Sequence, residues 1–435
     1  MTTTATARPR EDPWSLASWI VIAGGAVILP LVVGYGTHEG FRLPKELLFF
    51  GISIAAVALI AAGSVLRATD IVQRLAPYRN VLRILAAAAL WALLTAALSS
   101  NRILSLHALG RFAAAAALFL ATLALIRGRS FRVLGLMLAP VVMNAAVLLL
   151  QVAHVWNPFR FPVEYDERLT YTGLIGNAND MGVYLVVPAV VAMVLAVVDG
   201  RLRLLWIALA AVALAAIGAT LTITAMVAVA AAALVLFFRI KPRLGIAVAV
   251  LIPIALAAAV ATYAPLRERA STFAHAAKAR DVETLTSQRF VASITTWEMF
   301  RDHPLFGVGP GCFPFQYMPY RLLVDRRHPL VGGSLFRAQP NFGEAHDDHL
   351  QLLAETGVPG YAIFLAALVL LASVSFRRNG AEDDAARTAG LLALPLATAI
   401  FVSCLTQFPL HLAAPLYEYL FAAAACLAWR RADVA

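Results

Sequence analysis

The stretch from Val133 to His154 reads VLGLMLAPVVMNAAVLLLQVAH and contains no Asp, Glu, Lys or Arg. A helix of about twenty such residues crosses the roughly 30 Å of hydrocarbon in a bilayer, because it rises about 1.5 Å per residue. Trp14 to Tyr35 is a second uncharged stretch of this kind. Over the whole chain, hydrophobic residues make up 61% and charged residues 14%, against roughly 45–50% and 25% in soluble proteins. The sequence therefore predicts an all-α polytopic membrane protein.

Apolar runs along the chain predict about twelve transmembrane helices. They lie near residues 14–35, 47–66, 84–98, 111–126, 133–154, 181–198, 204–219, 222–238, 244–262, 358–375, 388–408 and 413–429. The run from Leu204 to Phe238 would be roughly 52 Å long as one helix, too long for a single crossing. We therefore expect it to fold back near Thr220.

The distribution of Lys and Arg predicts the orientation, because short basic loops stay on the cytoplasmic side. With the N-terminus inside, the inner segments carry nineteen Lys and Arg residues and the short outer loops carry six. Both termini are therefore expected in the cytoplasm. The net charge of +10 is dispersed over separate loops, a pattern that argues against nucleic acid as a partner. The three cysteines are irregularly spaced, which argues against a disulfide framework.

The remaining ten basic residues lie between Ala264 and Gly357, in a connection of roughly ninety residues on the outer side. Loops of that length are usually functional. We therefore divide the chain into nine membrane helices over 1–262, a long outer loop with short helices over 263–357, and three membrane helices over 358–435. Chemistry is expected in the outer loop.

Two patterns in this loop suggest local structure. Phe290, Ile294 and Trp297 recur at helical spacing within Ser287 to Asp302, which predicts an amphipathic helix that ends at His303. The glycines of Gly307-Val-Gly309-Pro-Gly311 predict a turn whose backbone can approach a ligand closely, although a plain connector explains them equally well.

The stretch from Glu344 to Gly357 predicts a helix beside the membrane surface. His346 and His349 are three residues apart and should share a helix face, with at least one imidazole toward the membrane domain. A histidine there can remove a proton from a sugar hydroxyl at neutral pH. Solvated interfacial residues are the alternative. A metal site is not expected, because successive helical residues point in different directions.

The predicted outer loop before the sixth span is also polar. Arg168 there can bind a phosphate bidentately. Asn177 and Asn179 can bond sugar hydroxyls or, alternatively, cap the sixth helix.

Five stretches, in this order and spacing, resemble the O-antigen ligase and Wzy-type polymerase superfamily, membrane enzymes of bacterial surface-polysaccharide assembly. They are Arg42-Leu-Pro-Lys45, Thr172-Gly-Leu-Ile-Gly-Asn177-Ala-Asn179, Pro304-Leu-Phe-Gly-Val-Gly309-Pro-Gly-Cys-Phe313, Ala345-His346-Asp347-Asp348-His349-Leu-Gln-Leu-Leu-Ala-Glu355-Thr-Gly357-Val-Pro-Gly360 and Gln407-Phe-Pro-Leu410. The resemblance implies a GT-C-like fold in the bacterial inner membrane. It also implies transfer of a glycan from an undecaprenyl-diphosphate carrier to a glycan or lipid A-core acceptor on the periplasmic side, without a cofactor, nucleotide sugar or required metal.

The resemblance also suggests roles for single residues. His346 aligns with the loop histidine of the family, usually followed by Asn where this chain has Asp347. Arg289 occupies the position of an arginine expected to engage the diphosphate. Many members carry a Ser-Arg pair after the seventh span, where this chain has Thr224-Ala225, so Arg168 is our candidate for the second diphosphate contact.

We therefore expect a direct displacement in which His346 deprotonates or orients the acceptor hydroxyl, while Arg289 and Arg168 stabilise the departing diphosphate. The other expected substrate-binding residues are Asn177, Asn179, Gly309, Asp347 and His349.

A transporter or lipid-linked glycan flippase is the alternative function. Carriers usually need ionisable groups at mid-membrane depth, and Glu418 is the one clear acid within the predicted spans. The sequence leaves open the choice between polymerase and ligase, the sugars and the oligomeric state.

Overall fold

The computed structural model describes residues 12–34, 39–66, 69–159, 167–287, 289–327, 342–376 and 384–429. Within these ranges the chain forms helices and no strands. Among the described residues, eleven helical segments are long and apolar enough to cross a membrane, and Ala413–Trp429 is a shorter apolar helix. The predicted all-α polytopic fold is therefore confirmed.

The membrane helices follow the predicted apolar runs. They are α1 (Pro13–Ile28), α2 (Arg42–Val65), α4 (Arg79–Ala97), α5 (Arg102–Ile126), α6 (Ala139–Val152), α7 (Ala178–Val198), α8 (Arg203–Thr220), α9 (Ile223–Ile240), α10 (Pro242–Thr262), α16 (Asp348–Ser373), α17 (Asp384–Cys404) and α18 (Ala413–Trp429). The shorter helices are α3 (Ile71–Leu75), α11 (Ala264–Ala279), α12 (Val282–Leu285), α13 (Phe290–Asp302) and α14 (Phe313–Arg327), with single 3₁₀ turns at Leu29–Leu31, Ala76–Tyr78, Phe131–Leu138, Glu167–Thr170, Val374–Phe376 and Pro409–His411.

Helix α7 forms the centre of the bundle and α10 lies at its edge. Over an 18-residue stretch of α7, 83% of the residues are buried, whereas over the same length of α10 only 6% are. A helix that is apolar on all sides is normally buried in protein or in lipid. The two helices represent these two cases, since α7 is covered by protein and α10 presents its apolar side chains outward.

The predicted turn near Thr220 is confirmed. Helix α8 ends at Thr220, and α9 begins at Ile223. Between them Leu221 has a left-handed backbone with φ 52°, which ends α8 because this conformation does not continue a right-handed helix. The long apolar run therefore forms two helices.

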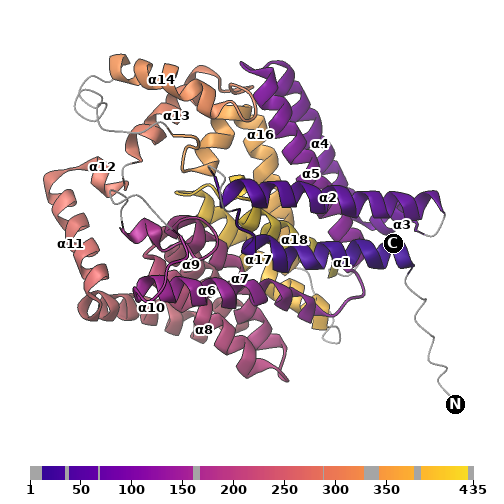
Figure 1. Ribbon diagram of the computed structural model, residues 1–435, viewed down its shortest axis with the longest axis horizontal. Coiled ribbons are helices and arrows are strands. Elements are labelled where there is room, and N and C mark those ends of the chain that lie inside the picture. Colours follow the sequence, from indigo (N-terminus) through magenta and orange to yellow (C-terminus); the bar gives the residue numbers. More distant parts are fainter. Residues whose placement is uncertain are drawn as a thin grey trace.

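Helices α11 to α14 form the segment between α10 and α16. In Figure 1 they lie along the left and top of the molecule, away from α3 at its right-hand end. Helix α13 ends at Asp302, as the His303-Pro304 pair predicted. Its buried side was predicted wrongly, because Trp297 is 47% exposed whereas Glu298 is buried. Arg327 of α14 forms an ion pair with Glu298 and so covers the polar face.

The division of the chain at 262 and 357 stays a prediction. Helix α10 ends at Thr262, and α16 begins at Asp348. Gly357 interrupts α16 with a φ of 69° and a ψ of −176°. Of the predicted site residues, His349 lies on the short helix before this kink, and Asp347 is its N-cap.

Candidate active site

The glycine-rich stretch lies against the kink of α16. The Val308 and Gly309 N–H groups donate to the carbonyls of Ala354 and Glu355 at 2.9 and 3.0 Å, and the Val358 N–H donates to the Pro304 carbonyl at 2.9 Å. A Cβ on Gly357 would lie 2.1 Å from the Leu305 carbonyl oxygen. Glycine is therefore required here, because the two backbones touch.

Glu355 holds the end of the same glycine-rich stretch. Its buried carboxylate accepts the N–H groups of Gly311 and Phe313 at 2.9 and 3.1 Å. The amide of Gln351 donates to the same carboxylate at 3.2 Å. Bonds to a charged acceptor are stronger than neutral ones, so Glu355 is the main polar tie between α16 and this loop.

A second set of bonds ties α16 to the segment before α18. The Oδ1 atom of Asp348 lies 2.7 Å from Nδ1 of His411, and its Oδ2 accepts the Leu410 N–H at 2.9 Å. Gln351 accepts the Ala345 N–H at 2.8 Å through Oε1, which turns its amide nitrogen toward Nε2 of His411 at 3.2 Å. Burial lowers the pKa of His411, but the charge of Asp348 and its hydrogen bond outweigh burial and raise this pKa above its ordinary value.

His346 lies just before this helix rather than on it. Its φ is 54°, and α16 begins two residues later with Asp347 as its N-cap. The expectation that His346 and His349 share a helix face was therefore wrong. The imidazole lies between the rings of Phe342 and Phe408, with centroid distances of 5.4 and 4.7 Å. Within the described ranges neither of its nitrogens makes a hydrogen bond, and Nδ1 is buried.

The surroundings of His346 keep its imidazole neutral. Burial and, to a smaller extent, the charges of Arg289 and Arg42 together lower its pKa to about 3. A neutral imidazole that makes no hydrogen bonds has a nitrogen lone pair free to accept a proton, but positive charges nearby make it a weak base. An anion bound beside the arginines would offset their effect on this pKa.

Arg289 is held at the start of α13 by the end of α17. Its Nη1 donates to the Thr406 carbonyl at 2.9 Å. Burial, together with the charges of Arg168 and Arg269, lowers its pKa to about 10. In the described part of the chain Arg289 is anchored by a carbonyl and forms no ion pair with a carboxylate, although the charge of Asp180 acts on it from a distance.

Arg168 reaches the same place from the loop before α7. Its Nη1 donates to Oδ1 of Asn179 and to the Thr220 carbonyl, both at 3.2 Å. Thr220 ends α8, four residues before Thr224. Thr224 of the following helix contacts Thr406 through its hydroxyl. Arg168 therefore lies beside the end of α8, and its charge lowers the pKa of Arg289.

Asn177 and Asn179 have different roles in the structure. Asn177 caps α7, because its Oδ1 accepts the N–H groups of Asn179 and Asp180 at 2.8 and 3.0 Å. Asn179 holds the guanidinium of Arg168. The capping alternative thus applies to Asn177, and sugar binding by either residue stays a prediction.

Arg42 belongs to the site, although the sequence analysis did not include it among the site residues. It lies at the start of α2 and forms ion pairs with Glu344 at 3.1 Å and Asp180 at 3.4 Å. Its guanidinium also lies 5.0 Å from the ring centre of Phe408. The only available signal was its place in a stretch that resembles the family.

His349 lies away from this group. Its Nε2 lies 2.9 Å from the Phe401 carbonyl oxygen, and Nδ1 lies 3.2 Å from the Tyr361 hydroxyl. The imidazole is buried between α16 and α17, as expected for a histidine that points into the membrane domain. A substrate role for His349 stays a prediction.

Asp347 and Gly309 serve the fold in visible ways. Asp347 accepts the Leu350 N–H at 2.9 Å as the N-cap of α16, and burial raises its pKa to about 6. A Cβ on Gly309 would lie 2.2 Å from Cβ of Ser99, so the close approach at this glycine is to the chain itself. Their roles in substrate binding stay predictions.

The four ionisable residues from His346 to His349 diverge. Asp348 is bonded to His411, and the other three have the separate surroundings given above. In the described residues no group of three His, Cys, Asp or Glu side chains has the arrangement of a metal site.

The fold and the site together define a polytopic membrane protein whose candidate site is built from His346, Arg289, Arg168 and Arg42 at helix ends and in loops. Residues 205–365, from α8 to the membrane part of α16, match the family model described as O-antigen ligase. Over this part of the chain, the match supports the resemblance to the O-antigen ligase and Wzy superfamily. The family implies a membrane enzyme of the ligase or polymerase kind that acts on lipid-linked glycans. No curated protein matches the chain.

Proposed function

We propose that the protein transfers a glycan from an undecaprenyl-diphosphate carrier to a sugar hydroxyl on the periplasmic side of the bacterial inner membrane. It would act as a polysaccharide polymerase or an O-antigen ligase, with both termini in the cytoplasm. The acceptor would be a growing glycan or a lipid A core. The proposal rests on two neighbouring relations, because Arg168 lies close enough to Arg289, and Arg289 close enough to His346, for their charges to act on one another.

The arginines provide the diphosphate site. Arg289 and Arg168 are anchored by carbonyl and amide oxygens, which fix their positions, and within the described residues Arg289 forms no ion pair with a carboxylate. Like charges held together repel one another, and a bound diphosphate relieves that repulsion. Because the leaving group gains negative charge as the glycosidic bond breaks, the same arginines bind the transition state more strongly than the ground state.

His346 provides the proton acceptor. The acceptor hydroxyl oxygen bonds to the anomeric carbon while the bond from that carbon to the phosphate oxygen breaks. The hydroxyl proton passes to the neutral imidazole, and undecaprenyl diphosphate leaves with the electron pair. The low pKa of His346 in the empty site requires that the bound anion raise its basicity first. The reaction is then coupled to occupancy by the donor.

Transport of a lipid-linked glycan is the second candidate, and Glu418 is the observation that favours it. This residue is 1% exposed in α18, and neither carboxylate oxygen has a hydrogen-bond partner within the described residues. Ionisable groups inside a membrane are costly and often functional. The arginine and histidine site favours transfer over transport.

The test is glycan assembly in a strain that lacks the gene and is complemented with variants. Arg289→Ala and His346→Ala should reach wild-type levels in the membrane and fail to restore long or attached glycan. Arg301→Ala is the matched control, because this arginine lies on the same helix with 51% of its side chain exposed. Full restoration by both site variants would remove the transferase proposal, and loss only with Glu418→Gln would favour transport.

A further inference from the structure

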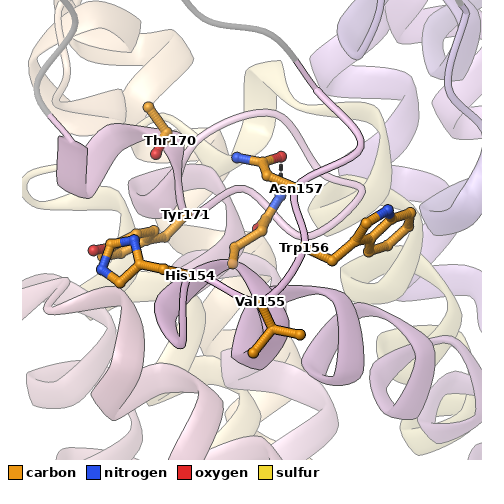
Figure 2. Close-up of a pocket in the computed structure, with 7 residues that line it drawn as sticks. His154, Val155, Trp156, Asn157, Thr170 and Tyr171 are labelled. Atoms are coloured by element: carbon orange, nitrogen blue, oxygen red, sulfur yellow. Dashed lines mark hydrogen bonds between the residues drawn. The ribbon is translucent and has the colours of Figure 1, made fainter.

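A pocket of about 260 Å³ lies in the loop between α6 and α7. Figure 2 shows the paired rings of His154 and Tyr171 on one side of the view and the indole of Trp156 on the other, with Asn157 between them. Pockets for drug-sized ligands measure roughly 300–1,000 Å³. This one therefore suits a single ring-sized group.

The lining is aromatic and polar. The rings of His154 and Tyr171 meet edge to face with centroids 6.4 Å apart, and Trp156 is 52% exposed. Among the lining residues that the structure describes there is no Asp, Glu, Lys or Arg. A sugar ring has apolar C–H faces and polar edges, so aromatic surfaces with neutral hydrogen-bonding groups fit it. A phosphate would find no cation in these side chains.

Gln151 holds the pocket in shape. Its Oε1 accepts the N–H groups of Thr172 and Gly173 at 3.0 and 2.9 Å. Its Nε2 donates to Oδ1 of Asn157 and to the Thr172 hydroxyl, both at 3.1 Å. This buried amide is fully used for support. A pocket with fixed walls loses less conformational entropy on binding.

Asn157 offers a donor to a ligand. Its Oδ1 accepts from Gln151 and from the Phe159 N–H at 3.1 Å. Within the described residues no bond engages Nδ2, so the amide is oriented by two bonds through oxygen while its nitrogen remains a donor. A sugar hydroxyl is a suitable acceptor.

The pocket adjoins the arginine site. Thr170, which lines the pocket, follows Arg168 by two residues, so their Cα atoms are at most about 7 Å apart. The Tyr171 N–H donates to the Arg168 carbonyl at 3.2 Å. One short turn therefore carries a wall of the pocket and an arginine of the diphosphate site.

We propose that this pocket is a saccharide subsite that holds an uncharged sugar ring of the glycan, placed by the shared turn beside the diphosphate. The proposal rests on the proposed transferase function. The ring belongs to the lipid-linked donor or to the acceptor, two sources with the same chemistry. An interfacial tryptophan that only anchors the bundle in lipid is the other explanation of Trp156.

The first measurement is direct binding to the full-length protein in nanodiscs. The probe is a lipid-free oligosaccharide, released by mild acid from the surface glycan of the source bacterium. Trp156→Ala and Asn157→Asp should each weaken its binding at least tenfold, and Asn157→Asp keeps the oxygen that supports the loop. Trp297→Ala, which removes another half-exposed tryptophan, should leave binding within twofold. No binding to the wild type, or unchanged binding to both pocket variants, overturns the subsite.

The second measurement is turnover with donor and acceptor varied separately. If the pocket is a subsite, Trp156→Ala and Asn157→Asp should each raise the Michaelis constant for one substrate at least tenfold and leave kcat within about threefold of the wild type. The constant that rises identifies the donor or the acceptor as the source of the ring. Unchanged Michaelis constants in both variants overturn the subsite. Arg289→Ala separates the two proposals, because it should abolish turnover and retain oligosaccharide binding. If the wild-type protein binds the oligosaccharide but shows no turnover, that result contradicts the transferase function and leaves the saccharide subsite standing.

Discussion

Gly357→Ala should destabilise the protein strongly, because Gly357 lies where α16 touches the glycine-rich stretch. Its φ of 69° and ψ of −176° lie in a region that is essentially restricted to glycine. An added Cβ would lie 2.1 Å from the Leu305 carbonyl oxygen and 2.9 Å from the Phe306 nitrogen. The overlap involves backbone atoms, so no side-chain rotation relieves it. The two segments must separate, and the Val358 bond to the Pro304 carbonyl is lost.

Two terms set the size of the effect. A non-glycine residue in a rare backbone region costs about 1–3 kcal/mol. A buried N–H left without an acceptor costs about 1–3 kcal/mol more. The sum of about 2–6 kcal/mol is a large part of the roughly 5–15 kcal/mol by which folded proteins are stable. Because the displaced loop leads to α14 and borders α16, activity should fall with stability.

The assay is thermal unfolding of the purified protein in detergent, with membrane levels compared by immunoblot. Gly51→Ala is the control, because no atom lies within 4 Å of the Cβ position in the exposed middle of α2. That change should be neutral or slightly stabilising. If Gly357→Ala melts at the same temperature as Gly51→Ala and retains activity, the close backbone contact does not exist as described.

The remaining predictions concern titration and polar support. Burial raises the pKa of the Asp347 carboxyl to about 6, above its value in the unfolded chain. The folded state therefore loses stability as the pH rises from about 4 to 6, because the buried carboxyl must then ionise, and it loses none below about pH 4. Asp347→Asn should therefore raise the melting temperature more at pH 8 than at pH 4, with the cap retained. Glu355→Gln should lose about 1–3 kcal/mol in denaturant unfolding, because one backbone N–H then faces an amide NH₂. The pKa of His346, about 3, predicts that kcat/KM keeps its value down to about pH 5; an acid limb at 6.5 that disappears in His346→Gln would contradict this.

Much of the fold was predictable because a lipid environment leaves few alternatives. Helices must satisfy their own backbone and must match the bilayer in length. The break at Thr220 followed from length alone, and the structure supplies the left-handed Leu221 that makes it. The end of α13 followed from His303-Pro304. Its buried face did not, because the partner of Glu298 is Arg327 on α14, a contact that the periodicity of one helix does not contain.

The site was predictable only in part, for a similar reason. Arg289 and His346 were predicted from the family resemblance. Their relative positions depend on how the start of α13, the start of α16 and the segment after α17 pack together, which the sequence does not show. Arg42 was missed because its partners Asp180 and Glu344 are far away in sequence. His346 was placed on the helix because the predicted helix began at Glu344. Asp347 is the cap, and the chain before it turns through a left-handed residue.

The electrostatics of the empty site suggest why donor binding and catalysis belong together. The charges of Arg289 and Arg42 lower the pKa of His346 in addition to burial, and those of Arg168 and Arg269 act on Arg289. A bound diphosphate opposes these effects, so it should raise the pKa of His346. The coupling between protonation of His346 and binding of the diphosphate is reciprocal. If binding raises the pKa of His346 by one unit, the protein with a protonated imidazole binds the diphosphate at most ten times more tightly than the protein with a neutral one. Binding of a short prenyl diphosphate should therefore tighten as the pH falls below the raised pKa, and His346→Gln should remove that dependence while Arg289→Ala removes the binding itself. Thus the imidazole would be a weak base in the empty site and a stronger one once the lipid-linked substrate is bound.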